Sequence, residues 1–514
     1  MVVAQVLDIG PAGHRFGAFL AAALSGGLLA LSFPSFGHPA AAWVALTPLL
    51  VVLYGTRSLS RAFGLGLMTG AIHFAGMLPW LTRVMIEFGG VALPVGVLLN
   101  GLLVAYLALF PAAFTVIVAL LCARLGGWAL LSAAPVWLTT ELGRLWLFGG
   151  FPWELLGYSQ TGVLPVAQLA SVFGVHGVTL LVVFVNSALA IALVGSPSRR
   201  VPMLATAAGV VAVVVAFGAW RISDNRLVAS GTPLQVGLVQ GNVPQDVKWD
   251  QAFRQTILER YLDLSRQSAA DGARLIVWPE SATPFRFEDD PSGEAVRQLA
   301  RDTGAHLLFG STQVKMNPEP QDFVAAFALR PDGGTAAVYH KRHLVPFGEY
   351  VPFQSLLFFV SPLVETVANF TPGTGPLTLP IGTHLASTAI CYEIIYPGLV
   401  RSFVRQGSQL LTTITNDAWY GRSAAPHQHF QQATMRAIEQ GRFLVRAANT
   451  GISGVVDPYG RVLERSALFE TAVITKEVRL LSGLTVYGRI GDLLAYLCLA
   501  LTVSAVFVVW RTRL

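Results

Sequence analysis

Charged residues are scarce in this sequence. Asp, Glu, Lys and Arg make up 12% of the 514 residues, whereas an average soluble protein carries about 25%. This shortage excludes an ordinary soluble protein, and with 53% hydrophobic residues it indicates that much of the chain lies in lipid. The charges are sparse before Arg221, frequent from there to about Arg489, and sparse again until the last four residues. We therefore expect a membrane part, a water-soluble part and one further membrane segment.

Cysteine is also rare, and its placement excludes two kinds of site. Two of the three cysteines, Cys122, Cys391 and Cys498, fall in apolar segments, so a disulfide framework is not expected. There is no CxxC or Cys/His cluster, and His427 and His429 have no acidic or cysteine partner at ligand spacing, so no metal site is predicted. The net charge of +6 comes largely from arginines in short loops and reports membrane topology, not nucleic-acid binding.

Long apolar runs predict the membrane-spanning helices, each of which needs about 20 apolar residues. Seven lie near 16–33, 40–54, 61–80, 91–117, 124–142, 168–195 and 202–220, and an eighth lies near 490–510. Because apolar segments keep following the first one, we interpret it as an uncleaved helix and not as a signal peptide. The expected domains are a membrane domain with seven helices at 1–221, a soluble domain at 222–487 and a C-terminal transmembrane helix at 488–514.

Arginines between these segments predict the orientation in the membrane. If the segments alternate, one side holds Arg15, Arg57, Arg61, Arg124, Arg199, Arg200, Arg511 and Arg513. The other side holds Arg83 and Arg144, accompanied by acidic residues. The positive-inside rule then places both termini in the cytoplasm and the soluble domain outside. The outer loop 148–154 fits either a contact with a lipid headgroup or substrate, or an interfacial anchor.

From Leu234 onward, short strands alternate with helices and hairpin turns. Strands are predicted at 234–240, 274–278, 306–310, 322–329, 335–340, 385–390, 409–415, 442–447 and 452–456, and helices at about 248–269, 291–303, 394–407 and 427–441. This mixture predicts an α/β sandwich in which helices cover sheet.

A carboxylate, an ammonium and a thiol each follow the end of a predicted strand. They are Glu280, Lys341 and Cys391. A carboxylate partly desolvated beside Trp278 and Pro279 is suited to accept a thiol proton. A lysine ammonium stabilises an oxyanion, and a thiol forms a covalent acyl intermediate. The three positions together favour nucleophilic catalysis, although each strand end alone is unremarkable.

Cys391 lies at a predicted strand-to-helix turn, because the stretch from Tyr392 to Val400 is typical of a helix start. Free backbone N–H groups and the positive end of the helix are expected to lower the thiol pKa there. A lone cysteine is otherwise more often a small buried hydrophobic residue. The presence of Glu280 and Lys341 favours the nucleophile.

Five stretches of the soluble part carry a family resemblance. They are Leu238–Gln245 with Lys248-Trp249, Trp278–Ser281, Lys341–Pro352, Ile390–Glu393 and Asn416–Gly421. With these motifs, the sequence resembles the nitrilase superfamily and, within it, the apolipoprotein N-acyltransferase family. The order of seven membrane segments, an outer domain and a final segment is also similar, so the resemblance covers nearly the whole chain. It implies an α-helical transmembrane bundle joined to an extracytoplasmic, nitrilase-like α-β-β-α sandwich.

The resemblance also implies roles for individual residues. It makes Glu280 the general base, Lys341 the stabiliser of the transition state and Cys391 the nucleophile. The further residues that it implies are two supporting carboxylates, Glu349 and Glu393, and two substrate-contacting aromatic residues, Trp249 and Tyr392. Without the resemblance, Glu349 fits either a second acid/base group that holds Lys341 or a turn carboxylate between Gly348 and Tyr350.

The reaction that the resemblance implies joins two lipid substrates. An acyl chain passes from a phospholipid, through a cysteine thioester, to the free α-amino group of the diacylglyceryl-cysteine of an apolipoprotein. The expected partners are these two substrates and the bilayer, without nucleic acid, metal or other cofactor. We expect a monomer in the bacterial inner membrane, with its catalytic domain on the periplasmic side.

Two other functions remain to be distinguished. A membrane-tethered nitrilase-type amidase or hydrolase would share the same three residues but use water as the acceptor. A transporter with an outer ligand-binding domain is disfavoured, because the membrane segments hold few ionisable groups.

Two further stretches fit two interpretations each. The run 356–360 fits a loop that dips into lipid or plain core packing. The stretch 416–419 fits a pocket wall or an Asx turn.

Overall fold

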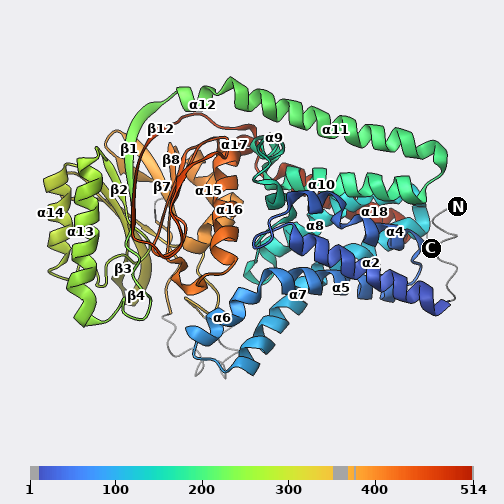
Figure 1. Cartoon of the computed structure of the whole chain (residues 1–514), viewed down its shortest axis with the longest axis horizontal. Helices are drawn as coiled ribbons and strands as arrows, with labels where there is room; N and C mark the ends of the chain where they lie inside the picture. The colour runs from blue at the N-terminus through green and yellow to red at the C-terminus, as the bar shows by residue number, and fades with distance from the viewer. Residues whose placement is uncertain (1–10, 351–368, 376–377, 512–514) are drawn as a thin grey trace. The chain divides into compact units, whose positions relative to one another are not determined.

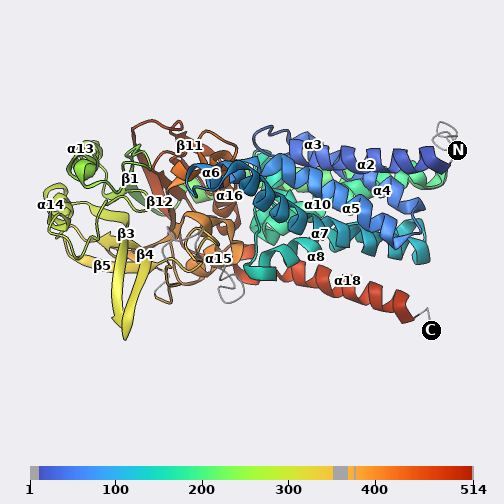
Figure 2. The same ribbon diagram turned by 90° about the horizontal axis from the view of Figure 1, so that it is seen from below.

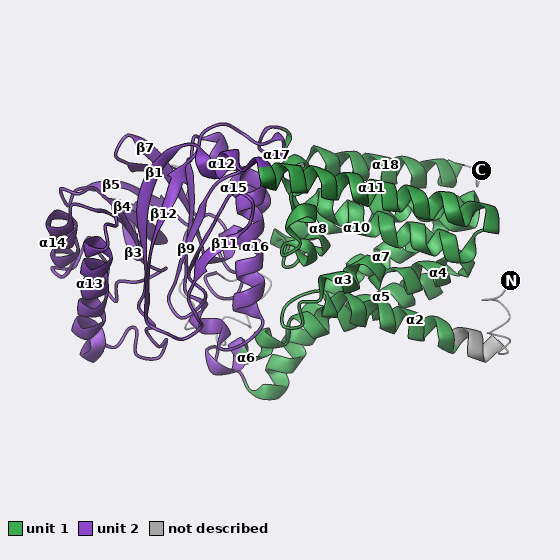
Figure 3. Ribbon diagram, turned by 45° about the horizontal axis from the view of Figure 1, so that its top comes forward, with its two compact units in different colours: residues 1–83, 92–223, 490–514 green, residues 84–91, 224–489 purple. Residues whose placement is uncertain are grey.

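The computed structural model describes residues 11–350, 369–375 and 378–511. The apolar run 356–360 lies outside the described residues. The chain forms two compact units (Figure 3). Unit 1 contains residues 1–83, 92–223 and 490–514, and unit 2 contains residues 84–91 and 224–489.

Unit 1 is built from apolar helices. Its described helices are α2 (Pro11–Leu31), α3 (Pro39–Ala45), α4 (Thr47–Gly55), α5 (Leu59–Met77), α7 (Leu93–Leu125), α8 (Ala133–Trp146), α9 (Leu164–Ala167), α10 (Ala170–Val194), α11 (Pro197–Asp224) and α18 (Leu493–Arg511), and α6 (Pro79–Glu87) continues from α5. Several of the long helices run alongside one another (Figure 2). Four helices are long and apolar enough to cross a membrane, namely Leu93–Leu125, Ala170–Val194, Pro197–Ala229 and Leu493–Arg511. The pair α5–α6 meets the same criterion but is bent by 52°. The number and bounds of the spanning segments therefore stay a prediction.

A buried asparagine explains why the apolar run near 40–54 forms two short helices. Asn186 Oδ1 accepts the backbone N–H groups of Leu46 at 2.8 Å and Thr47 at 3.0 Å, and its Nδ2 donates to the Ala42 carbonyl at 2.9 Å. Without these bonds, the backbone groups at the helix break would be unsatisfied in an apolar environment, which is costly. One side chain on α10 thus stabilises the junction between α3 and α4.

Small residues bring α5 and α7 into close contact. A Cβ atom at Gly66 would lie 2.4 Å from the Pro111 carbonyl oxygen, and one at Gly70 would lie 2.7 Å from Ala108 Cα. Only glycine fits at these two positions, which is how apolar helices commonly pack in membranes.

Unit 2 contains two six-stranded sheets. In the first, the strand order is β12 (Ala472–Leu480), β1 (Thr232–Gln240), β2 (Leu275–Val277), β3 (His306–Asn317), β4 (Glu319–Leu329), β5 (Thr335–His340). In the second, it is β11 (Val462–Arg465), β10 (Gly454–Val456), β9 (Leu444–Ala448), β8 (Leu410–Thr415), β7 (His384–Ile390), β6 (Leu379–Ile381).

Helices cover the outer faces of both sheets. Figure 1 shows α13 (Arg254–Ala270) and α14 (Gly293–Thr303) on the first sheet, and α15 (Pro397–Arg405) and α16 (Ala425–Gln440) on the second. The remaining short helices of this unit are α12 (Arg226–Ala229) and α17 (Val486–Ile490). The result is the four-layer α-β-β-α sandwich that the resemblance implied, so the predicted fold class is confirmed.

The strand directions place the ends of four chain segments at the carboxyl ends of their strands. Strands β1, β2 and β3 pair in parallel, as do β7, β8 and β9. Strand β4 is antiparallel to both β3 and β5, so β5 runs in the same direction as β2. The residues that follow β2, β5, β7 and β8 therefore leave their sheets at the carboxyl ends of strands, the usual place for a site in α/β proteins.

Several strands differ from the prediction. Strand β3 continues to Asn317 instead of ending near Gly310, and its end forms with β4 a hairpin that projects from the sheet in Figure 2. Strands β6, β11 and β12 were not predicted. Strand β12 pairs with β1 along all of Thr232–Gln240, but Lys476, Glu477 and Arg479 interrupt its apolar pattern.

Candidate active site

The structure brings together the functional groups that follow β2, β5 and β7. Lys341 Nζ lies 3.1 Å from Glu280 Oε1 and 2.6 Å from Glu349 Oε1. The Cys391 thiol lies close enough to Glu280 and Lys341 for their charges to act on its pKa. Glu280, Lys341 and Cys391 are all buried. A base, a cation and a thiol thus share one secluded site, as the sequence predicts.

Lys341 is a fully buried ammonium held between two carboxylates. Burial lowers its pKa, but the charges of Glu280 and Glu349 outweigh this and leave the pKa above its usual value. Lys341 therefore stays protonated at any physiological pH. A fixed cation in a water-poor site stabilises negative charge that develops nearby.

Glu349 is connected to the site and is not an isolated turn carboxylate. Its Oε1 accepts from Lys341, and its Oε2 accepts the Val345 backbone N–H at 2.8 Å. Burial raises the pKa of Glu349, Lys341 lowers it and Glu280 raises it again, for a net upward shift. Glu349 thus holds Lys341 together with Glu280 and binds the backbone of the loop that follows β5.

The backbone at Cys391 forms a sharp turn. Its φ of 51° lies in the left-handed region, which non-glycine residues rarely adopt and which costs about 1 kcal/mol or more. A 3₁₀ turn at Cys391–Ile395 follows, and the regular helix begins only at Pro397. The predicted helix start at Tyr392 is therefore wrong by about one turn.

The thiol pKa moves in the direction opposite to the prediction. Burial raises the pKa of Cys391, and the neighbouring Glu280 raises it further, although Lys341 and a hydrogen bond with Thr415 oppose this. The expectation of a lowered pKa fails because the thiol is desolvated and no helix starts beside it. The resting group is therefore the neutral thiol, which can act as a nucleophile only if a nearby base accepts its proton, and the charge of Glu280 reaches the thiol.

Glu393 joins the two loops that carry Lys341 and Cys391. Its Oε1 accepts the Arg342 N–H at 2.6 Å, the His343 N–H at 3.2 Å and the Tyr339 hydroxyl at 2.8 Å. Its Oε2 accepts the Ile390 N–H at 2.8 Å. Burial raises the pKa of Glu393 to about 7, against the effect of these bonds. This carboxylate connects the end of β5 to the end of β7.

The two predicted substrate-contacting aromatic residues differ in exposure. Trp249 is 51% exposed, whereas Tyr392 is only 4% exposed and packs edge-on against Tyr396, with ring centroids 5.4 Å apart. Trp249 is therefore available to a ligand, whereas the Tyr392 ring is buried against Tyr396. Their roles in substrate binding stay predictions.

The stretch 416–419 contributes directly to the site. The Asn416 backbone N–H donates to Glu280 Oε2 at 3.1 Å, and its Nδ2 donates to Gln245 Oε1 at 2.7 Å. Trp419 is partly exposed and contacts Phe88 edge-on, with ring centroids 5.0 Å apart. This arrangement favours the interpretation of the stretch as a wall of the site.

Sequence reasoning missed the role of Lys248. Its side chain is 3% exposed, and its Nζ donates to the backbone carbonyl of Glu280 at 3.3 Å. Burial lowers the pKa of Lys248 from 10.5 to about 8, although the Glu280 charge opposes the shift. The only signal in the sequence was its place beside Trp249 in a motif. A second lysine thus supports the backbone of Glu280.

Lys248 predicts a specific pH dependence of stability. The folded state binds the Lys248 proton more weakly than the unfolded chain does. Below pH 8, the buried ammonium therefore lowers the free energy of unfolding by about 3 kcal/mol. This loss of stability disappears as the pH rises from 8 to 10.5. We expect the wild type to gain stability relative to Lys248→Met between pH 7 and pH 10. Thermal unfolding of both proteins in detergent measures this difference. The exposed Lys476→Met is the control, and a wild-type–Lys248→Met difference independent of pH would contradict the prediction.

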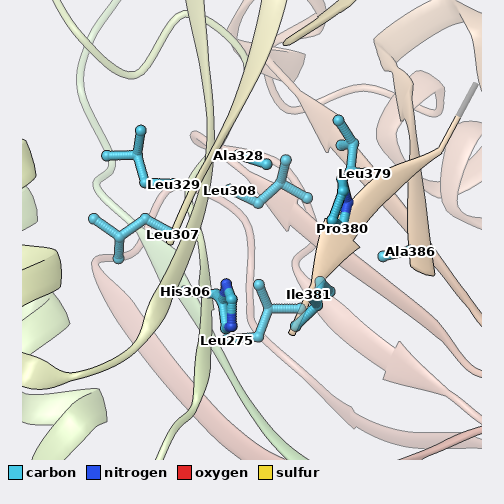
Figure 4. Close-up of a pocket in the computed structure, with 10 residues that line it drawn as sticks. All are labelled: Leu275, His306, Leu307, Leu308, Ala328, Leu329, Leu379, Pro380, Ile381 and Ala386. Atoms are coloured by element: carbon cyan, nitrogen blue, oxygen red, sulfur yellow. The ribbon is translucent and has the colours of Figure 1, made fainter. Parts of the chain in front are cut away.

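A small apolar pocket lies between the two sheets, away from these residues (Figure 4). It is lined by Leu275, His306, Leu307, Leu308, Ala328, Leu329, Leu379, Pro380, Ile381 and Ala386. Leu275 begins β2 and Ala386 lies near the start of β7, whereas Glu280 and Cys391 follow the ends of those strands. The pocket therefore lies towards the opposite edge of the sheets. In the parts of the chain that the structure describes, no group of His, Cys, Asp and Glu side chains is arranged to hold a metal ion.

Comparisons with known proteins cover both units. Residues 25–188 match the apolipoprotein N-acyltransferase N-terminal domain, and residues 235–482 match the carbon-nitrogen hydrolase domain. The apolipoprotein N-acyltransferase of Geobacter metallireducens is 40% identical over 494 residues, which cover 94% of this chain and 93% of that protein. The one from Methylococcus capsulatus is 36% identical, over 91% of this chain and 92% of that protein. Among solved structures, an amidase from Nesterenkonia sp. is 24% identical with a TM-score of 0.36, over 49% of this chain and 93% of that chain.

These matches assign the protein in two steps. The domain match at 235–482 and the buried Glu280, Lys341 and Cys391 define an enzyme of the carbon-nitrogen hydrolase class. The full-length relatives and the match at 25–188 narrow this class further, and the chain belongs to the apolipoprotein N-acyltransferase family. The acyltransferase interpretation is thereby favoured over the amidase alternative.

Proposed function

We propose that the protein transfers an acyl chain from a phospholipid to the α-amino group of a diacylglyceryl-cysteine at the N-terminus of an apolipoprotein. The observation that carries the proposal is the convergence of Glu280, Lys341 and Cys391 in one buried site. Both proposed substrates are lipids, and unit 1 contains helices that are long and apolar enough to cross a membrane.

In the first half-reaction, Cys391 Sγ attacks the ester carbonyl carbon of the phospholipid while its proton passes to Glu280. The oxyanion of the tetrahedral intermediate is stabilised by Lys341, which stays charged because of its two carboxylate neighbours. The carbon–oxygen ester bond then breaks, and Glu280 returns the proton to the leaving oxygen. The products are a lysophospholipid and an acyl thioester on Cys391.

In the second half-reaction, the free α-amine of the lipoprotein attacks the thioester carbon. Glu280 accepts a proton from the attacking nitrogen, the carbon–sulfur bond breaks, and Cys391 recovers the proton as a thiol. The product is an amide, which is more stable than the thioester, so the transfer runs downhill without a nucleotide. In this scheme Glu349 and Glu393 position the reacting groups, and Trp249 and Tyr392 contact the substrates.

The proposed membrane arrangement follows from the arginine distribution. Both termini lie in the cytoplasm of a bacterial cell, and residues 222–487 face the periplasm between the inner-membrane segments 1–221 and 488–514. The phospholipid donor is taken from the outer leaflet, and the protein works as a monomer. Reaction of single cysteines in the 57–61 and 285–290 loops with an impermeant thiol reagent in intact cells tests the sidedness.

The test of the function is the intact mass of the purified protein after incubation with phospholipid. We expect the wild type to gain the mass of one acyl chain and Cys391→Ala to gain none. Adding a diacylated lipopeptide with a free α-amine should discharge the adduct, whereas an N-acetylated lipopeptide should not. Cys122→Ala and Cys498→Ala are matched controls that should still form the adduct.

The outcome separates the candidate functions. Discharge of the acyl group at the same rate without lipopeptide would identify a hydrolase, as the amidase alternative requires. Absence of any adduct, with Cys391→Ala still functional in cells, would remove Cys391 from the mechanism.

A further inference from the structure

The carbonyl group of the nucleophile is bound by a histidine that the mechanism above does not use. His429 Nε2 lies 3.0 Å from the backbone oxygen of Cys391. A carbonyl oxygen can only accept, so Nε2 carries a proton and donates it. His429 lies on α16, which covers the second sheet, and it is fully buried. The contact therefore joins the covering helix to the turn that carries the thiol.

The other ring nitrogen of His429 is held by two buried charged residues. His429 Nδ1 lies 3.1 Å from Asp417 Oδ1 and 3.0 Å from Arg446 Nη2, and Arg446 Nη2 donates to Asp417 Oδ2 at 2.8 Å. An ionised Asp417 only accepts and the guanidinium only donates, so Nδ1 can hydrogen-bond just one of them. With the single ring proton on Nε2, facing the Cys391 carbonyl, Nδ1 accepts from Arg446, while Asp417 accepts from Arg446 and Thr415. Burial and the Arg446 charge also lower the pKa of His429, which keeps the ring neutral. Both arguments define the same tautomer, with its single proton on Nε2.

Asp417 is also connected to the Cys391 side chain, through the Thr415 hydroxyl group. The Thr415 hydroxyl donates to Asp417 Oδ1 at 2.7 Å and also hydrogen-bonds the Cys391 thiol. On the other side of the turn, the Ile390 N–H is held by Glu393. The N–H of the residue before Cys391 and the carbonyl group of Cys391 are thus held by separate partners.

A left-handed cysteine needs such support. The φ of 51° at Cys391 is unfavourable for a residue with a Cβ atom and persists only when its surroundings enforce it. Rotation about the N–Cα bond of Cys391 would relieve this strain, and it would move Sγ and the Cys391 carbonyl group together. The donor that opposes this rotation is His429 Nε2.

We propose that His429, oriented by Asp417 and Arg446, is a positioning residue that holds the Cys391 backbone in its reactive conformation through the Nε2–H···O=C hydrogen bond. This proposal rests on the proposed function, because the reaction that His429 supports is the acylation of Cys391 by phospholipid. It assigns to the buried Asp417–Arg446–His429 network a role in the rate of thioester formation, not in binding of the phospholipid.

Two amide substitutions separate this role from general support of the fold. Glutamine can place an N–H donor near the position of Nε2, whereas the shorter asparagine keeps polar atoms near Nδ1 but does not reach the Cys391 carbonyl. We expect His429→Asn to slow acyl-enzyme formation about 30-fold at saturating phospholipid, with the half-saturating concentration within twofold of the wild type. His429→Gln should keep at least about a fifth of the rate. The exposed His427→Asn, two residues earlier on the same helix, is the matched control.

The readouts keep the two proposals distinguishable. Alkylation of Cys391 by iodoacetamide, followed by peptide mass spectrometry, measures thiol positioning without any acyl substrate, and it should follow the same order of variants. Equal rates in His429→Asn and His429→Gln, for both acylation and alkylation, would overturn the positioning role. Loss of acylation in the wild type itself would overturn the proposed function, and the alkylation series would still decide the role of His429.

A measurement on the unsubstituted protein covers the case in which the variants do not fold. Nitrogen-15 spectra of histidine-labelled protein report the tautomer of each ring. We expect the Nε2–H form at His429, and a proton on Nδ1 alone would exclude donation to Cys391 and overturn the proposal.

Discussion

Replacing Lys341 with methionine should lower the rate of acyl-enzyme formation about a thousandfold. Lys341 Nζ is the cation between Glu280 and Glu349, at 3.1 and 2.6 Å. Methionine fills a similar volume but offers no charge to the oxyanion, and it leaves two buried carboxylates side by side. The second effect should raise the pKa of Glu349, which then lacks the cation that lowers it. The mass-shift assay with phospholipid, followed over time, measures the rate.

The stability of this variant provides an independent check. Removing one partner of a buried ion pair usually costs about 3–5 kcal/mol, because the remaining charge is uncompensated. The loss should shrink as pH falls, because protonation of the two carboxylates removes their repulsion. Lys476→Met is the matched control, since its ion pair with Glu464 is half-exposed and contributes little. A Lys341→Met protein that forms the acyl-enzyme at the wild-type rate would remove Lys341 from transition-state stabilisation.

The ends of the strands that precede Glu280, Lys341 and Cys391 were predictable because they depend on local signals. The predicted strand 335–340 has the observed bounds, and the predicted strands before Glu280 and Cys391 end within one residue of the observed ends. Short β-branched runs bounded by polar residues carry this information within a few positions. Once the strands are parallel, their carboxyl ends meet at one edge, which is why Glu280, Lys341 and Cys391 could be placed together.

The protonation of Cys391 was not predictable, because it depends on what surrounds the turn. A strand-to-helix turn in water favours a thiolate, whereas the observed turn is buried and leads into a 3₁₀ turn. The sequence contains no local signal for that burial. The sign of the pKa shift was wrong for this reason, although the position of the thiol was right.

The pairing of buried polar side chains could not be predicted from the sequence for a related reason. His429 is 38 residues from Cys391, and Asn186 is 140 residues from Leu46, so their pairing depends on how helices pack. Taken alone, His429 was considered only as a metal ligand and rejected. Its partners lie on three other elements, namely the 3₁₀ turns at Cys391–Ile395 and Asp417–Tyr420 and strand β9. Side chains whose polar groups meet only in the folded protein are those that sequence patterns cannot assign.

Replacing Glu393 with glutamine should lower the acylation rate about a hundredfold without changing the half-saturating phospholipid concentration by more than about twofold. The carboxylate accepts four donors, from Tyr339, Arg342, His343 and Ile390. A glutamine amide has only one accepting atom, so its NH₂ group has to face at least one of these donors. Either the loop that carries Lys341 or the turn that carries Cys391 then shifts, and a displacement of a fraction of an ångström between reacting groups is enough to slow catalysis.

Tyr339→Phe tests whether this effect arises from the joined loops. It removes one donor to Glu393 Oε1 and leaves the contacts to Arg342, His343 and Ile390 in place. We expect it to cost about 1 kcal/mol of stability and to keep the acylation rate within about threefold. If Tyr339→Phe lost as much rate as Glu393→Gln, the loss would come from the buried hydroxyl and not from the link between the two loops. If Glu393→Gln kept the wild-type rate, the carboxylate would serve stability alone, and Lys341 and Cys391 would be held by Glu349 and the sheet without it.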